Sequence, residues 1–76
     1  MASNDPCFVP FGDVARDRLG MQCQYARHYL LMPDINLGIR WQGRIEEYHG
    51  LMIHLDDVET FVKRALAWRR AKGIIA

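Results

Sequence analysis

The longest periodic stretch of hydrophobic positions lies between residues 55 and 72. Apolar side chains return there at steps of three and four residues, the period of one helix face. They are Val58, Phe61, Val62, Ala65 and Leu66. Asp56 is suited to cap the first free N–H groups, with Glu59 as the partner in a capping box, and Gly73 follows a basic last turn. The pattern predicts an amphipathic helix that must bury its stripe against the rest of the chain.

Two shorter helical patterns precede this one. The first covers residues 12–19 and ends at Gly20, and the second covers residues 22–31 and ends at Pro33. The second buries Ala26, Tyr29 and Leu30 and exposes its polar side. Because only one or two residues separate the two helices, they must cross steeply, as in a helix-turn-helix.

The period changes from helical to two after a loop predicted at Asp34, Asn36 and Gly38. Apolar residues then alternate with polar ones over residues 39–45 and 51–55, which predicts a small antiparallel sheet. Candidate turns lie at Gln42-Gly43 and His49-Gly50, and the pattern leaves open whether there are two strands or three. The predicted class is α+β: two short helices, a β-hairpin and a C-terminal amphipathic helix.

Composition indicates one folded domain. Of 76 residues, 50% are hydrophobic and 25% are charged, and the formal net charge is +1. We expect a flexible N-terminal arm at residues 1–7 and a single domain over residues 8–76. Cys7 and Cys23 are the only cysteines and no leader pattern precedes them, so we expect a reduced, cytoplasmic protein. No apolar run reaches the length of a membrane span.

The sequence gives no support to catalysis or metal binding. Cysteine and histidine residues lack the paired spacing of a zinc site, and no glycine-rich phosphate loop or nucleophile-base pair is visible. Asp56, beside Asp57, is better explained as a helix cap than as part of a carboxylate site. We therefore expect no enzyme activity and no cofactor.

A helix-turn-helix followed by a hairpin is a winged arrangement, in which the second helix enters the major groove and the hairpin contacts the backbone or the minor groove. Glutamine can pair with adenine and arginine with guanine, while surface cations neutralise phosphates. Basic character gathers near the C-terminus, where residues 63–76 hold five cations and no acid. The candidate DNA-binding residues are Gln22, Gln24, Arg27, His28, Arg40, Gln42, Arg44, Lys63, Arg64 and Arg70.

Several short motifs resemble the small winged-helix proteins of the phage excisionase and MerR-like group. They are Asp13-Val14-Ala15, Leu19-Gly20-Met21, Ala26-Arg27-His28-Tyr29-Leu30, Ile39 to Arg44 as the wing, and Ile53 to Phe61 as the closing strand and helix. The resemblance covers about residues 8–66. It implies a sequence-specific binder of double-stranded DNA that acts as a recombination directionality factor, as a small repressor or as both. Gln24, Arg27 and His28 would then face the major groove, and Arg44 would make the wing contact.

The main competing hypothesis is a protein-interaction module without enzyme activity. The same scaffold in a phage or plasmid protein would then bind a host protein through Trp41, Tyr48 and Trp68. Under the DNA-binding hypothesis the further partners left open are a second copy of the chain, as a dimer or a cooperative array on DNA, and a recombinase.

Overall fold

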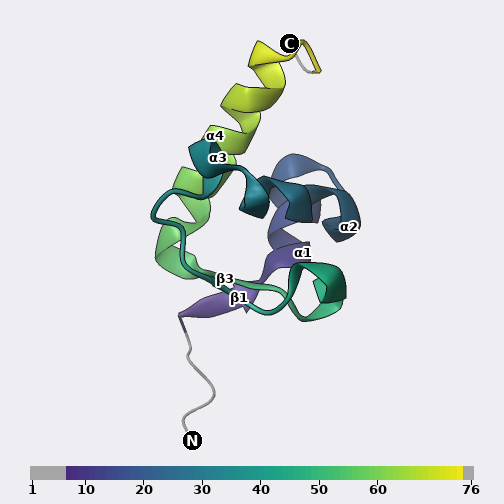
Figure 1. Cartoon of the computed structure of the whole chain (residues 1–76), viewed down its shortest axis with the longest axis vertical. Helices are drawn as coiled ribbons and strands as arrows, with labels where there is room; N and C mark the ends of the chain where they lie inside the picture. The colour runs from purple at the N-terminus through teal and green to yellow at the C-terminus, as the bar shows by residue number, and fades with distance from the viewer. Residues whose placement is uncertain (1–6, 75–76) are drawn as a thin grey trace, which may run out of the picture.

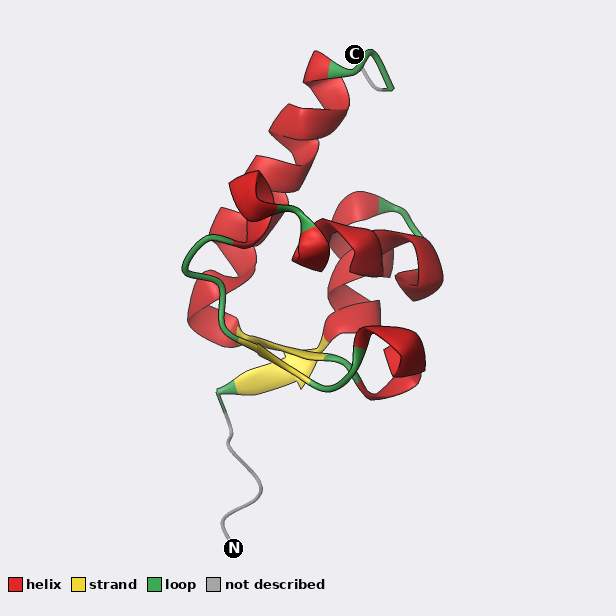
Figure 2. Ribbon diagram, viewed as in Figure 1, coloured by secondary structure: helices red, strands yellow, loops and turns green. Residues whose placement is uncertain are grey.

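The chain runs through a strand, a helix pair, two more strands and a long helix (Figures 1 and 2). The computed structural model describes residues 7–74, without the side chains of Tyr48 and His49. Of the predicted N-terminal arm, residues 1–6 lie outside the described residues. Cys7 lies inside them and accepts a backbone hydrogen bond from Leu55. The result is a compact α+β domain.

The predicted helix pair is confirmed. α1 (Phe11–Val14) continues into η1 (Ala15–Leu19), and after a short turn α2 (Cys23–Ala26) continues into η2 (Arg27–Leu31). Gly20 has a φ of 65°, a left-handed conformation that glycine adopts without steric cost. The N–H of Met21 then bonds to the carbonyl of Ala15, which closes the end of the first helix.

The prediction of a loop from Asp34 to Gly38 was wrong in its first half. Pro33 begins a further helical turn, α3 (Pro33–Asn36), in which Ile35 is buried. The N–H groups of Ile35 and Asn36 both bond to the carbonyl of Met32. Proline ends one helix and suits the first position of the next, because its fixed φ is already helical and its missing N–H is not needed there.

The sheet has three antiparallel strands in the order β1-β3-β2. β1 (Phe8–Pro10) and β2 (Trp41–Gln42) both pair with β3 (Met52–His54). The sequence left open whether a third strand exists, and this third strand is β1, near the N-terminus. The two candidate turns and the strand expected at Arg44-Ile45 were wrong. The chain between β2 and β3 instead contains η3 (Ile45–Gly50), a 3₁₀ segment with a kink at Glu47.

The long helix forms as predicted. η4 (Leu55–Asp57) leads into α4 (Val58–Ala71), together 17 residues, and Val58, Phe61, Val62 and Ala65 are buried while Leu66 is half-buried. At its end the N–H groups of residues 73 and 74 bond to the carbonyls of residues 70 and 69, a Schellman motif around Gly73.

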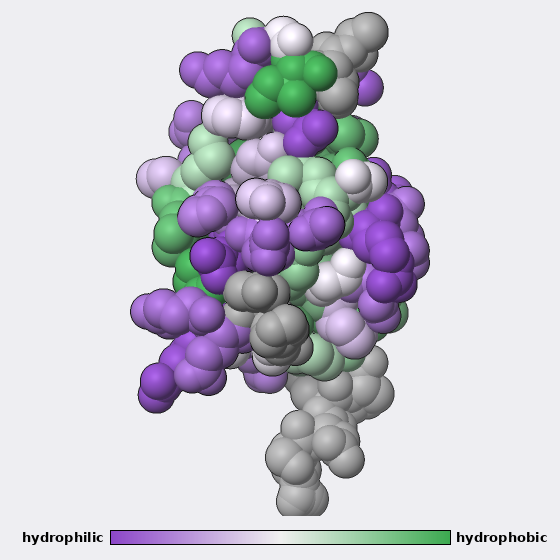
Figure 3. Space-filling view, turned by 90° about the vertical axis from the view of Figure 1, so that its right-hand side faces the viewer, coloured by the Kyte–Doolittle hydropathy of each residue, from purple (hydrophilic) through white to green (hydrophobic). Residues whose placement is uncertain are grey.

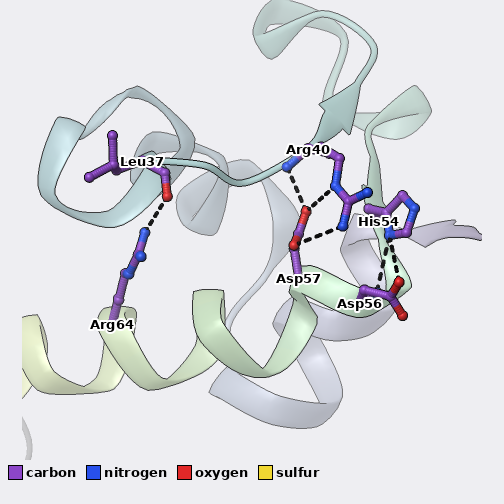
Figure 4. Close-up of polar contacts among 6 residues, drawn as sticks. All are labelled: Leu37, Arg40, His54, Asp56, Asp57 and Arg64. Carbon is purple, nitrogen blue, oxygen red and sulfur yellow. Dashed lines mark hydrogen bonds and ion pairs between the residues drawn. The ribbon is translucent and has the colours of Figure 1, made fainter.

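The predicted capping box was wrong. Nδ1 of His54 accepts the hydrogen bond from the backbone N–H of Asp56 at 3.1 Å and so caps this helix (Figure 4). Glu59, the expected partner of Asp56, instead accepts two hydrogen bonds from Arg18 at the end of η1. The start of the helix is thus set by the last residue of β3, because the imidazole of His54 is buried and held edge-on to Phe8.

The core lies between the sheet, the helix pair and α4. The largest fully buried side chains are Phe11, Leu30, Ile35, Leu51, Ile53 and Phe61. The rings of Phe11 and Phe61 meet edge to face with centroids 5.3 Å apart, which joins the first helix to α4. The end of α4 extends past the other elements (Figure 1). Within the described range, no helix combines the length and the apolar character needed to cross a bilayer.

Candidate nucleic-acid interface

The second helix of the pair presents a straight row of exposed side chains. Its second half, η2, is wound as a 3₁₀ helix with three residues per turn, so side chains three positions apart lie directly above one another. His28 and Leu31 lie above one another in η2, and Tyr25 stands three positions before His28, in α2. These three residues are exposed and form the exposed row, and Gln22 precedes it at the N-cap position. The row is the exposed face of the second helix of the pair.

Arg27 and Gln24 lie off this row. Arg27 is half-buried and its Nη1 donates to the carbonyl of Ile45 at 3.3 Å, so the guanidinium contacts the start of η3. Gln24 is half-buried as well. Of the three residues expected on the outer face of this helix, only His28 is exposed there, and the hydrogen bond to Ile45 turns Arg27 towards η3.

The arginines predicted in the wing already have carboxylate partners. Asp57 accepts three hydrogen bonds from Arg40, from its backbone N at 2.9 Å, its Nε at 2.9 Å and its Nη2 at 3.2 Å (Figure 4). These bonds hold the pKa of Asp57 below the usual range of an aspartate. Arg44 is exposed, with Nη1 3.8 Å from a carboxylate oxygen of Glu47. Gln42 is exposed.

The cations of α4 divide into two groups. Arg64 is half-buried and donates from Nη1 to the carbonyls of Ile35 and Leu37, at 3.1 and 2.6 Å, and thereby ties α4 to the end of α3 (Figure 4). Lys63 and Arg70 are exposed, and over residues 7–74 neither has a carboxylate within ion-pair distance. Only the second group is available to neutralise an anion.

Arg69 connects the end of α4 to the turn of the helix pair, a role that the sequence analysis missed. Its Nη1 donates to the hydroxyl of Tyr29 at 3.2 Å and lies 2.9 Å from the sulfur of Met21. Trp68 packs edge to face on the same tyrosine, with ring centroids 5.6 Å apart. The exposed cation Arg70 is therefore carried on a helix end that is fixed beside the start of the second helix.

Figure 3 shows the side of the molecule that the helix pair occupies in Figure 1. Hydrophilic and weakly hydrophobic side chains are mixed over this face, strongly hydrophilic ones gather along both edges of the view, and a strongly hydrophobic group lies near its top. Such a mixed surface is typical of a polar interface rather than of a buried subunit contact.

Of the aromatic residues named in the competing hypothesis, the two tryptophans are described, and neither is fully exposed. Trp41 and Trp68 are half-buried and pack against the core, and the side chain of Tyr48 lies outside the described atoms. Among the described residues, no three histidine, cysteine or acidic side chains are grouped so that they could hold a metal ion. Burial raises the pKa of the Cys23 thiol above the usual range of a cysteine.

No family model, curated protein or solved structure matches this chain. The function is therefore inferred from the chain's own geometry.

Proposed function

We propose that this protein binds double-stranded DNA as a winged helix, with helix 23–31 in the major groove. The observation that carries the proposal is the exposed row Tyr25, His28 and Leu31 on the second helix of a helix-turn-helix. A major groove about 12 Å wide admits a single helix, and the free face of that helix is the one that meets base edges.

The sheet supports the same assignment. β1 precedes the helix pair and joins the far side of β3, while β2 and β3 form the ribbon that follows the pair. The segment from Gly43 to Gly50 at the end of this ribbon would be the wing. Its contact with the second helix, through Arg27 and Ile45, keeps ribbon and helix in a fixed relation.

In this proposal the residues predicted from the sequence divide by role. Gln22 and His28 contact base edges, and Gln42, Arg44 and Arg70 contact the phosphate backbone. Three of the predicted arginines stabilise the protein itself, because each donates a hydrogen bond to a carbonyl or carboxylate of another residue: Arg27, Arg40 and Arg64. The cellular role is that of a recombination directionality factor or of a small repressor, both of which depend on specific duplex binding.

The test is fluorescence anisotropy with a duplex selected from a random library and with a scrambled duplex of the same composition. We expect His28→Ala to reduce the preference for the selected duplex, because it removes a contact to a base edge. Arg70→Ala should weaken binding to both duplexes alike and lower the salt slope by about 1.

Arg16→Ala is the matched control for Arg70→Ala, since it changes net charge equally. Arg16 lies on the first helix, where it pairs with Asp13 and Asp17. An equal loss of affinity in both variants would mean that binding follows total charge rather than position. Failure to bind any duplex at low salt, together with recovery of one stoichiometric protein from a lysate, would favour the protein-interaction module instead.

A further inference from the structure

The exposed row contains two large hydrophobic side chains and no arginine or lysine. Within the described residues, the large hydrophobic side chains left exposed are Tyr25 (58%), Leu31 (58%), Leu37 (72%), Leu55 (55%) and Ile74 (51%). Two of these five stand at either side of His28, on the face that the proposed function assigns to the major groove. Apolar area at such a position is unfavourable in water and becomes favourable only against an apolar surface.

The spacing of the two side chains matches stacked base pairs. Tyr25 and Leu31 are two turns apart on the helix. At a rise of roughly 1.5–2.0 Å per residue, this separation is about 9–12 Å along the helix axis. That length corresponds to about three base steps of roughly 3.4 Å each.

The major groove offers one apolar group, the C5 methyl of thymine. Guanine is read most often by the paired donors of arginine or lysine. Arg27, the one arginine on this helix, donates to the carbonyl of Ile45 and lies off the row. The row therefore has the chemistry to meet thymine methyls, and Gln22 can pair with an adjacent adenine.

We infer that Tyr25 and Leu31 are specificity-determining residues that read thymine methyl groups about three base pairs apart. This inference rests on the proposed function, because it names which bases the second helix selects. It predicts that duplexes selected from a random library carry thymine at two positions with this separation. The two intervening base pairs face His28.

The experiment replaces thymine by deoxyuridine in the selected duplex. This change removes only the C5 methyl groups and leaves every base pair intact. We expect affinity to fall roughly fourfold for each methyl that the protein contacts, the factor for one buried methyl-sized group. Substitution at thymines elsewhere in the duplex should leave affinity unchanged.

Variants then assign the methyl contacts to residues. Leu31→Ala and Tyr25→Ala should each become insensitive to deoxyuridine at one of the two positions. Leu55→Ala is the matched control, because Leu55 is exposed to nearly the same extent, 55% against 58%, but lies at the start of the long helix. It should keep the full sensitivity of the unchanged protein. All three side chains are exposed, and thermal melting by circular dichroism verifies that the variants fold.

The outcomes separate this inference from the proposed function. If the protein selects a duplex and binds its deoxyuridine copy equally well, the methyl readout is wrong while DNA binding stands. The assignment to these residues is likewise overturned if Leu31→Ala and Tyr25→Ala retain the sensitivity of the unchanged protein. If no duplex is selected at all, the proposed function itself fails.

Discussion

Replacing Gly43 by alanine tests how the segment between β2 and β3 is closed. Gly43 has a φ of 104°, which side chains larger than hydrogen rarely allow. A Cβ added there would lie 2.8 Å from the carbonyl oxygen of Gly50 and 3.1 Å from Cα of Leu51. Both neighbours are backbone atoms, so no side-chain rotation relieves the contact.

Two costs combine at this position. Holding an alanine at a positive φ costs about 1–2 kcal/mol, and forcing backbone apart to admit a methyl group costs typically about 1–3 kcal/mol. We expect Gly43→Ala to lower the free energy of unfolding by about 2–5 kcal/mol. A domain of 76 residues has a total stability of roughly 4–11 kcal/mol, so the loss is a large part of the whole.

Urea unfolding followed by circular dichroism measures this loss, and two further glycines supply the controls. Gly20 also has a positive φ, 65°, but no atom lies within 4 Å of an added Cβ, so Gly20→Ala should cost only about 1–2 kcal/mol. Gly50 has neither a positive φ nor a close neighbour, so Gly50→Ala should be neutral or stabilise by up to about 1 kcal/mol. Equal losses at Gly43 and Gly20 would refute the close approach of residues 43 and 50.

Three further predictions concern polar contacts. Because Arg40 lowers the pKa of Asp57, the stabilisation from this pair is complete at neutral pH and is lost as the pH falls below about 4. Asp57→Asn should therefore lower the free energy of unfolding at pH 7 and make it depend less on pH in the acid range. Arg64→Ala should lower the free energy of unfolding by about 1–3 kcal/mol in urea, whereas Arg70→Ala, whose side chain is exposed, should leave it unchanged. His54→Ala removes the helix cap and should cost about 0.5–2 kcal/mol in thermal melting; an unchanged melting temperature would contradict the capping role.

The parts of the fold that were predictable from the sequence are those fixed by local pattern. The apolar stripe through Phe61 and Ala65 identified the long helix. Gly20 and Gly73 were predicted to end two helices, and both adopt the left-handed conformation at those helix ends. Both signals depend only on residues a few positions apart. That is why the helices could be placed without knowledge of the rest of the chain.

The errors occurred where contacts between distant residues decide the structure. β1 pairs with β3 across more than forty positions, and no feature near Phe8 indicates its partner. Asp56 and Glu59 have the spacing of a capping box, yet His54 and Arg18 provide the contacts instead. Local propensity did not reveal this competition, because it depends on where the sheet places His54.

The candidate site was only partly visible in the sequence. His28 is exposed as expected, but Arg27 is turned towards Ile45 because the helix winds with three residues per turn there. Ordinary helical periodicity places Arg27 outward and gives no reason to single out Tyr25 or Leu31. A search at a period of three residues would have found the row, but nothing in the sequence marks the change of winding.

Among residues 7–74, β3 is the central strand and β1 and β2 are the edge strands, and neither edge is suited to pair with another chain. The N–H of Leu55 donates to the carbonyl of Cys7, and the N–H of Phe11 donates to the carbonyl of Leu51. Because backbone groups alternate in direction along a strand, those of Phe8 and Pro10 point to the outer edge of β1, where Pro10 has no N–H to donate. On the other side β2 is only two residues long. A neighbouring molecule would find no continuous run of donors and acceptors to extend, so this sheet is protected from edge-to-edge aggregation.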